Sequence, residues 1–227
     1  MRSQKLKLEI LKIMHKKNSH LYKYLGYFFL VIVLTAFDQF TKLLAVDKLK
    51  NQAPFVIWDG VFEFSYVENR GAAFGMQQGM IALFVVITLI IVPLMIFIIH
   101  KIDKLIYVMG TKVNKKAFVF LQIVFVILIA GAIGNLIDRL ALGYVVDFLY
   151  FKLIDFPVFN VADCYVTVST IALILIGFFM LSEKELDYLL YSQKKWSVDI
   201  ASSDEDVKNE TSIGSDEKVE EDTDNED

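Results

Sequence analysis

Cysteine and histidine are scarce in this sequence. It has one cysteine, Cys164, and three histidines. A single cysteine excludes an intramolecular disulfide and any zinc site built from cysteines. The histidines (His15, His20 and His100) all lie outside the polar stretch described below, which argues against a histidine-based catalytic or metal site. We therefore expect no metal and no cofactor, and any chemistry must come from other side chains.

Apolar residues are abundant instead. They make up 56% of the 227 residues, aromatic residues make up 14%, and the mean hydropathy is +0.50. These values are typical of a polytopic membrane protein. Four long apolar runs stand out, and each is close to the ~20 residues that a helix needs to cross a bilayer. We expect four membrane-spanning helices, over residues 21–44, 80–99, 117–137 and 162–181.

Lysine and arginine are distributed unevenly around these runs. Seven lie in residues 1–23 and five in the short 100–116 connection, against four in residues 41–79 and two in residues 138–161. Because basic residues concentrate on the cytoplasmic side, both termini are predicted to be cytoplasmic. The 41–79 and 138–161 connections then face the outside of the cell membrane.

The two ends of the chain differ in charge. Residues 1–20 are predicted to be a basic cytoplasmic extension that fixes orientation, although an amphipathic helix on an anionic membrane surface is an alternative. The last 27 residues hold 12 of the 27 acidic residues, so residues 182–227 are predicted to be an acidic, disordered cytoplasmic tail. A membrane domain over residues 21–181 lies between them.

The first outer connection carries a hairpin signal. Residues 55–67 read FVIWDGVFEFSYV, two strand-like runs on either side of Asp59 and Gly60. Residues 144–151 (YVVDFLYF) form another strand-like run in the second outer connection. The predicted fold is therefore an all-α membrane protein with four transmembrane helices and a small extracytoplasmic sheet.

Polar side chains gather between the third and fourth apolar runs, in residues 131–163. Ionisable groups at membrane depth are costly and usually have a functional or pairing reason. The predicted topology brings this stretch to the outer face together with Asp38, from the end of the first run. The residues concerned within the stretch are Asn135, Asp138, Arg139, Asp147, Asn160 and Asp163.

Carboxylates in this group suggest acid–base chemistry. Two carboxylates that share a site cannot both ionise cheaply, so one keeps a proton, as in aspartic proteases. Asp163 is the first member, and its partner is either Asp138 or Asp147. Asp147 has apolar neighbours that would raise its pKa, whereas Asp138 adjoins Arg139 and suits a structural role. These grounds favour Asp147, although the residues alone leave both open.

Five blocks in order resemble the lipoprotein signal peptidase family, signal peptidase II. They are DQFTK (38–42), NRGAAFG (69–75), GAIGNLIDR (131–139), VVDF (145–148) and FNVAD (159–163). The resemblance implies a four-helix bundle with an outer β-cradle and a short interfacial helix. It also implies a membrane aspartic endopeptidase that cleaves a prolipoprotein before a diacylglyceryl-modified cysteine. The family's catalytic pair falls on Asp147 and Asp163.

Other matched positions are expected to bind substrate or support the site. Asp38 and Lys42 are spaced to pair on one helix face, as are Asn135 and Arg139. The full set is Asp38, Lys42, Asn69, Gly71, Ala72, Gly131, Asn135, Asp138, Arg139, Asn160 and Ala162. The expected partners are prolipoprotein substrates and membrane lipid, with no nucleic acid, and the chain is expected to be a monomer.

Two other functions compete with this interpretation. A proton-coupled transporter or channel subunit would need polar residues reaching the inner face, and the second run offers only Thr88 and the inner half of the third only Gln122. A lipid-phosphate enzyme with carboxylate-bound Mg²⁺ would need clustered acidic ligands and basic phosphate clamps. The carboxylates here are dispersed along the sequence.

Overall fold

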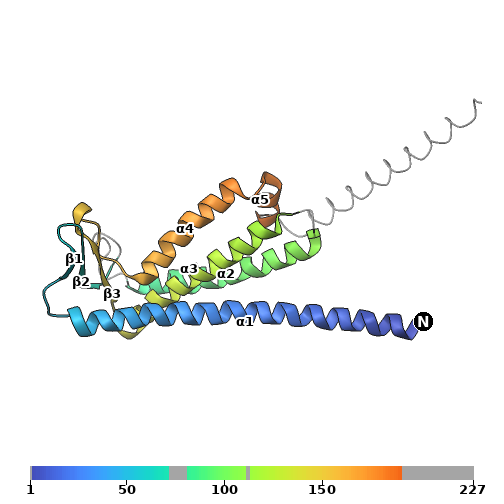
Figure 1. Ribbon diagram of the computed structural model, residues 1–227, viewed down its shortest axis with the longest axis horizontal. Helices are drawn as coiled ribbons and strands as arrows, with labels where there is room; N and C mark the ends of the chain where they lie inside the picture. Colours follow the sequence, from blue (N-terminus) through green and yellow to red (C-terminus); the bar gives the residue numbers. More distant parts are fainter. Residues whose placement is uncertain (1, 72–80, 111–112, 191–227) are drawn as a thin grey trace, which may run out of the picture.

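The computed structural model describes residues 2–71, 81–110 and 113–190 (Figure 1). Its elements in order are α1 (Arg2–Leu49), β1 (Phe55–Trp58), β2 (Phe62–Asn69), α2 (Ile81–Met109), α3 (Lys115–Ala141), β3 (Val145–Phe151), the 3₁₀ turn η3 (Lys152–Ile154), α4 (Val161–Phe179) and α5 (Glu183–Leu190). The sheet lies at one end of the helices, where α1 and α3 end and α4 begins (Figure 1). We call this the site end.

Within the described residues, four helices are long and apolar enough to cross a membrane, which confirms the predicted fold class. The candidate spans are His20–Leu49, Ile81–Met109, Lys115–Ala141 and Val161–Phe179. The first two extend beyond the apolar runs, and in the second the added turns carry Asp103, which pairs with Lys23 of the first. α1 also continues back to Arg2, so most of the predicted basic extension is helical.

The three strands form an antiparallel sheet in the order β1-β2-β3. The predicted hairpin is confirmed, and its turn contains Gly60 with a positive φ of 70°, which glycine adopts without strain. β2 pairs with β3 from Phe62–Phe151 to Asn69–Val145, with an irregularity between Phe64 and Val67. This pairing brings the ends of two distant segments together at the site end. Residues 72–80 lie outside the described residues.

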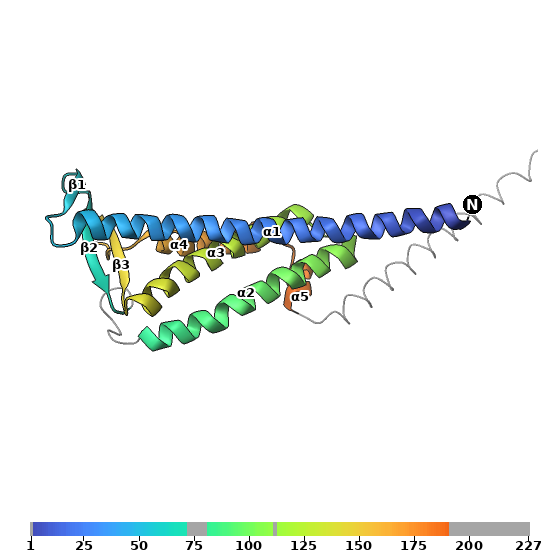
Figure 2. The ribbon, with the colours of Figure 1, turned by 90° about the horizontal axis from the view of Figure 1, so that it is seen from below.

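α3 is the central helix and packs against α1, α2 and α4. Glycine allows the close approach on two sides. A Cβ at Gly131 would lie 2.7 Å from the carbonyl oxygen of Ala162, and one at Gly134 would lie 2.5 Å from a carboxylate oxygen of Asp38. By contrast, the buried residues of α2 all lie in its C-terminal half, between Met95 and Met109, where the helix nears α1 (Figure 2).

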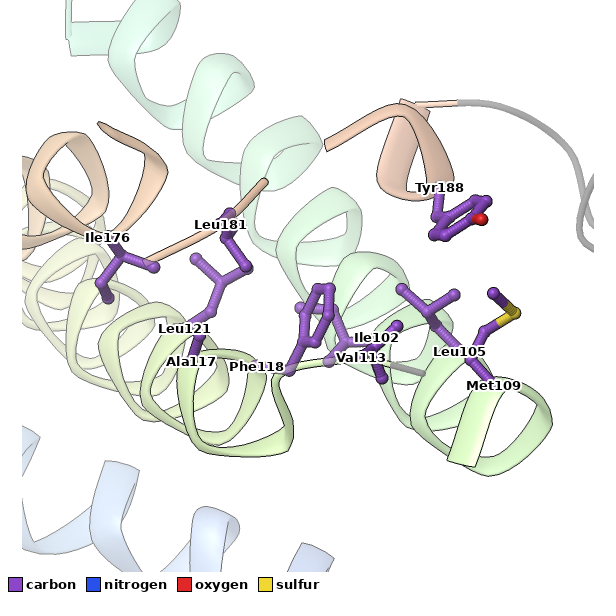
Figure 3. Packing of buried hydrophobic residues seen from close by; sticks show 10 residues of the cluster. All are labelled: Ile102, Leu105, Met109, Val113, Ala117, Phe118, Leu121, Ile176, Leu181 and Tyr188. Carbon is purple, nitrogen blue, oxygen red and sulfur yellow. The ribbon is translucent and has the colours of Figure 1, made fainter. Parts of the chain in front are cut away.

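The end opposite the sheet is closed by an apolar cluster that includes α5 (Figure 3). Tyr188 of α5 and Leu181 pack against Ile102 and Leu105 of α2 and Phe118 of α3. Residues 183–190, which the charge pattern predicts to be part of a disordered tail, instead form the helix α5. Tyr188 is buried in the apolar cluster with residues of α2, and Glu185 is buried where it accepts hydrogen bonds from Asn114 and Ser182.

Candidate functional site

A cavity of about 970 Å³ opens at the site end, between the sheet and the start of α4. Both aspartates of the expected catalytic pair line it, Asp147 from β3 and Asp163 from α4. Asn69, Gly71 and Arg139 also line it, as expected for substrate-binding residues. The rest of the lining is largely apolar and comes from the segment after β3 and from α4; it includes Phe156, Pro157, Val158, Cys164, Thr167 and Val168.

The first turn of α4 positions Asp163. Asn160 is the N-cap, and its side-chain oxygen accepts a hydrogen bond from the Asp163 backbone N–H at 3.0 Å. The Asp163 carboxylate in turn accepts from the Asn160 backbone N–H at 3.2 Å, which completes a capping box. Its other oxygen accepts from the Asn135 side chain at 2.8 Å. Helix capping therefore fixes this carboxylate in place.

Asp147 is held by two amides and is almost fully buried. Asn160 Nδ2 donates to one carboxylate oxygen at 2.6 Å, and Asn69 Nδ2 donates to the other at 2.8 Å. Burial and the nearby Asp163 carboxylate together raise the pKa of Asp147 to about 7, because they outweigh the two amides and the Lys42 charge, which lower it. Close to neutral pH, Asp147 thus divides between its protonated and ionised forms.

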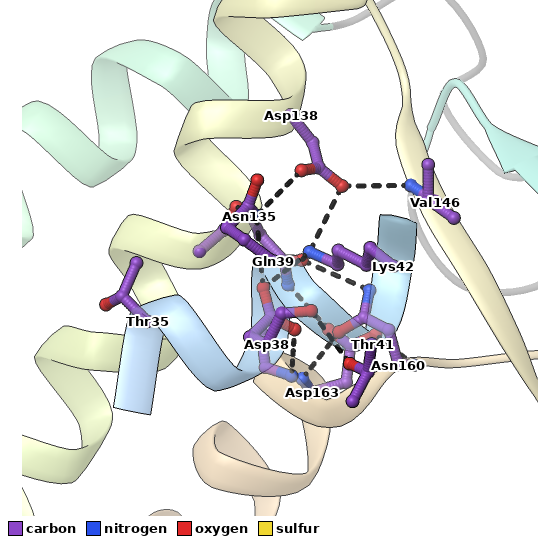
Figure 4. A network of polar contacts seen from close by, with 12 residues as sticks. Thr35, Asp38, Gln39, Thr41, Lys42, Asn135, Asp138, Val146, Asn160 and Asp163 are labelled. Atoms are coloured by element: carbon purple, nitrogen blue, oxygen red, sulfur yellow. Dashed lines mark hydrogen bonds and ion pairs between the residues drawn. The ribbon is translucent and has the colours of Figure 1, made fainter. Parts of the chain in front are cut away.

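A layer of charged groups joins α1 to α3 next to Asp163 (Figure 4). The Lys42 ammonium is 2.9 Å from Asp38 and 3.1 Å from Asp138, and it donates to Asn135 at 2.9 Å. All three of its donors are therefore used inside the protein. Asn135 accepts from Asn160 as well, at 3.1 Å, so this layer and the two aspartates form one hydrogen-bonded network.

Asp138 and Asp38 tie this layer to the backbone of the neighbouring elements. One oxygen of Asp138 accepts from the backbone N–H of Val146, the residue before Asp147, at 3.0 Å. One oxygen of Asp38 accepts from the backbone N–H of Ala162, the residue before Asp163, at 2.8 Å. Each of these carboxylates thus anchors the chain one residue ahead of a candidate catalytic aspartate.

The structure brings together the predicted site residues that it describes. Asp147, Asp163, Asn69, Gly71 and Arg139 line the cavity, and Arg139 also stacks over the Phe84 ring at 4.9 Å. Asp38, Lys42, Asn135, Asp138 and Asn160 form the network behind it, and Gly131 and Ala162 meet where α3 packs on α4. Ala72 lies outside the described residues.

Sequence reasoning missed Gln39. Its amide donates to Asp138 at 2.9 Å and to the Gly134 carbonyl at 3.1 Å, which links α1 to α3. The polar stripe of residues at positions 35, 38, 39 and 42 was the available signal, because those positions share one helix face.

Within 2–71, 81–110 and 113–190, no three or more His, Cys, Asp or Glu side chains cluster in a metal-binding arrangement. Asp38 and Asp138 already share the ammonium of Lys42. The site as it stands offers two amide-held carboxylates beside an open cavity.

Comparisons with known proteins agree on one family. Residues 30–179 match the family model described as signal peptidase (SPase) II. The chain is 41% identical to a lipoprotein signal peptidase of Clostridium tetani over 150 residues, 64% of this chain and 88% of the relative. It is 34% identical to one of Clostridioides difficile over 147 residues, 65% and 90% of the two chains. Two solved structures described as bacterial membrane enzymes superpose with TM-scores of 0.54 and 0.55, at 30% and 27% identity. The match to the first structure covers 67% of this chain and 86% of the solved chain. The match to the second covers 69% of this chain and 94% of the solved chain.

Proposed function

This chain belongs to the signal peptidase II family, and from that premise we propose that it is an aspartic endopeptidase whose catalytic pair is Asp147 and Asp163. The family membership confirms the resemblance in the sequence and makes the chain a peptidase that processes prolipoproteins. The aspartic mechanism, the position of the cleaved bond and the roles of individual residues are the proposal.

One observation carries the proposal most directly. Two carboxylates from separate elements line one cavity, and their hydrogen bonds come from side-chain and backbone amides, with the nearest ammonium one layer behind. Amides orient a carboxylate without forcing it to stay ionised. Burial and the mutual repulsion of the pair then keep one proton shared between them, as the raised pKa of Asp147 indicates.

The pair can hydrolyse a peptide bond without a nucleophilic side chain. Each carboxylate oxygen accepts one hydrogen bond within the protein and keeps a second acceptor position for water or substrate. The ionised member takes a proton from water as the water oxygen bonds to the scissile carbonyl carbon. The protonated member donates to the carbonyl oxygen, and a proton passes to the leaving nitrogen as the C–N bond breaks. As the C=O bond reforms, a hydroxyl of the tetrahedral intermediate returns its proton to the pair, which regains its single shared proton.

The substrate is a prolipoprotein whose cysteine carries diacylglycerol, and cleavage occurs just before that cysteine. The apolar part of the cavity, with Phe156, Val158 and Val168, suits the acyl chains beside α4. Arg139 and Asn69 offer donors to the substrate backbone. The enzyme acts as a monomer surrounded by membrane lipid.

We further propose the orientation predicted from the basic residues. The chain lies in the bacterial cell membrane with both termini cytoplasmic and the site at the extracytoplasmic face. The peptidase domain spans residues 21–181, preceded by the basic extension and followed by α5 and the acidic tail.

A transporter is the second candidate, and the buried Asp103 near the opposite end of α2 is the observation that favours it. Between Asp103 and the site lies an apolar cluster of Met95, Ile99, Val126 and Ile129. A chain of polar groups that would carry ions between the two faces is therefore interrupted among the described residues. The peptidase remains the better supported function.

Cleavage of a purified, diacylglyceryl-modified prolipoprotein tests the proposal by a shift on a gel. Wild type, Asp147→Asn and Asp163→Asn are each run with and without EDTA, after gel filtration shows that they are folded. We expect cleavage by wild type that survives EDTA and none by either variant. Lys48→Met, which changes an exposed side chain on α1, is the matched control and should cleave normally.

Two outcomes would overturn the mechanism. Full cleavage by a folded Asp147→Asn or Asp163→Asn would show that the pair is not catalytic. Loss of wild-type activity in EDTA, restored by a divalent ion, would point to a metal-dependent reaction.

A further inference from the structure

A second buried polar group lies at the end of the bundle opposite the site. Lys23 of α1, Asp103 of α2 and Gln122 of α3 form it, and we call it the distal cluster. The Lys23 ammonium is 2.5 Å from Asp103 and 2.7 Å from the Gln122 side-chain oxygen. The Gln122 amide donates to Asp103 at 2.9 Å and to the Ile99 carbonyl at 3.0 Å. The proposed chemistry uses none of these residues.

The distal cluster lies on the same face of α1 as the network behind the site. Polar contacts between α1 and α3 recur at a constant offset along that face. Tyr27 donates to Gln122, Thr35 to the Ala130 carbonyl and Gln39 to the Gly134 carbonyl; in each pair the partners are 95 residues apart. The two helices run in the same direction (Figure 1), so this constant offset means that one register holds along the whole contact.

The middle of this contact specifies register poorly. Between the polar groups, Leu30 and Val31 of α1 pack with Val126 and Ile129 of α3. Apolar side chains in a bilayer can repack in neighbouring registers at little cost, whereas a buried polar contact is satisfied in one register only. The distal cluster supplies such a contact at one end, and Gln39 and Lys42 supply it at the other.

α1 can transmit this constraint to the site. It is uninterrupted from Lys23 to Lys42, 19 residues that span about 28 Å at 1.5 Å per residue. A slide or rotation of α1 at the distal cluster would move Asp38 and Lys42 relative to Asn135. Those contacts hold Asp163 and the charge beside Asp147.

We propose that the distal cluster is a set of positioning residues that locks the register of α1 against α3 and thereby places Lys42 and Asp38 behind the catalytic pair. The inference rests on the proposed function for its effect on catalysis. Its structural part, the register itself, can be measured independently.

The test compares Asp103→Asn with Glu185→Gln in the full-length enzyme. Both changes convert a buried carboxylate to an amide at the same end of the bundle, with residue exposures of 7% and 8%. The Glu185 carboxylate accepts hydrogen bonds from Asn114 and Ser182, and neither residue belongs to α1. It therefore controls for loss of stability alone. Lys23→Met removes the positive charge of the distal cluster and should have the same effects on activity and register as Asp103→Asn.

Prolipoprotein cleavage is measured per folded molecule as a function of pH. For Asp103→Asn we expect kcat to fall about 10- to 100-fold, as for displacements of about 1 Å at a catalytic site, with KM within about twofold of wild type. The alkaline limb of the pH profile should also move upward, because Lys42 would recede from Asp147. Glu185→Gln should lower the melting temperature and leave kcat and the pH profile unchanged.

Spin labels report the register without any need for activity. Leu43 on α1 and Leu140 on α3 are 68% and 66% exposed at the site end, so both accept a label after replacement by cysteine in a Cys164→Ala background. The distance between them should shift or broaden in Asp103→Asn, by up to about one helical turn of 5.4 Å. It should stay unchanged in Glu185→Gln.

An unchanged label distance in Asp103→Asn and Lys23→Met, together with wild-type kcat per folded molecule, would overturn the proposal. If the proposed function itself is wrong, the result is different: Asp147→Asn will still cleave the prolipoprotein, whatever the label distances are.

Discussion

Lys42→Met provides the strongest test of how the site is held. Its ammonium is 2% exposed and lies between Asp38 and Asp138 while also bonding Asn135. Removing it leaves two buried carboxylates without their cation. Breaking a buried pair in this way costs about 3–5 kcal/mol. For a chain of this size that corresponds to a fall in melting temperature of about 6–20 °C.

Thermal unfolding in detergent measures this cost, with Lys48→Met on the same helix as the matched control. Lys48 is exposed and, among the described residues, its ion pair is with the equally exposed Asp47, so its loss should leave the melting temperature nearly unchanged. Asp138→Asn alone should also lower the yield of folded protein. The double variant Lys42→Met/Asp138→Asn should recover part of the stability, because one unpaired carboxylate is gone.

Equal melting temperatures for Lys42→Met and Lys48→Met would refute the reasoning that the buried ammonium holds α1 to α3. A double variant less stable than the sum of the two single variants would refute the idea that unpaired carboxylates cause the loss.

Three further predictions concern pH, packing and the far end of the bundle. The pKa of Asp147 is raised from 3.8 to about 7 on folding, so the folded state binds more protons than the unfolded state between those pH values. Wild type should therefore lose stability relative to Asp147→Asn as pH rises from about 4 to 7. Melting temperatures of both proteins measured across this pH range test the prediction. Gly134→Ala places a methyl group against Asp38 and should cost about 1–3 kcal/mol in thermal unfolding and reduce cleavage, whereas Gly177→Ala, with nothing within 4 Å, should be tolerated. Tyr188→Ala should cost about 3 kcal/mol in thermal unfolding because its burial is lost, while cleavage per folded molecule stays normal. Impaired cleavage would contradict this and show that α5 contributes to activity.

The spans and the hairpin could be predicted because their signals are local. Runs of about 20 apolar residues identify helices in a bilayer, and Asp59-Gly60 between strand-like runs identifies a turn. The placement of Asp147 and Asp163 at one cavity followed from topology and from the resemblance to a family. Each of these inferences depends on residues close together in the sequence or on a motif.

The partners of the charged residues could not be predicted, because they depend on the register between helices far apart in the chain. The second apolar run ends at residue 99 and therefore predicts Asp103 to lie in a connection, yet Asp103 is buried and contacts Lys23 and Gln122. Asp138 was given a structural role without a partner, and its anchoring of Val146 needs the position of β3. α5 was missed because its charges suggested a solvated tail.

Asn160 has two structural roles, and together they restrict which residues could replace it. Its oxygen starts α4, and its amide donates to Asp147 and to Asn135. Serine, threonine and aspartate all begin helices well. A single hydroxyl, however, cannot supply two donors, and aspartate would bring a third negative charge to the pair. Glutamine has the donors on a side chain one carbon longer. Few alternatives to asparagine are therefore open at this position, and a frayed first turn of α4 would disassemble the site along with the helix.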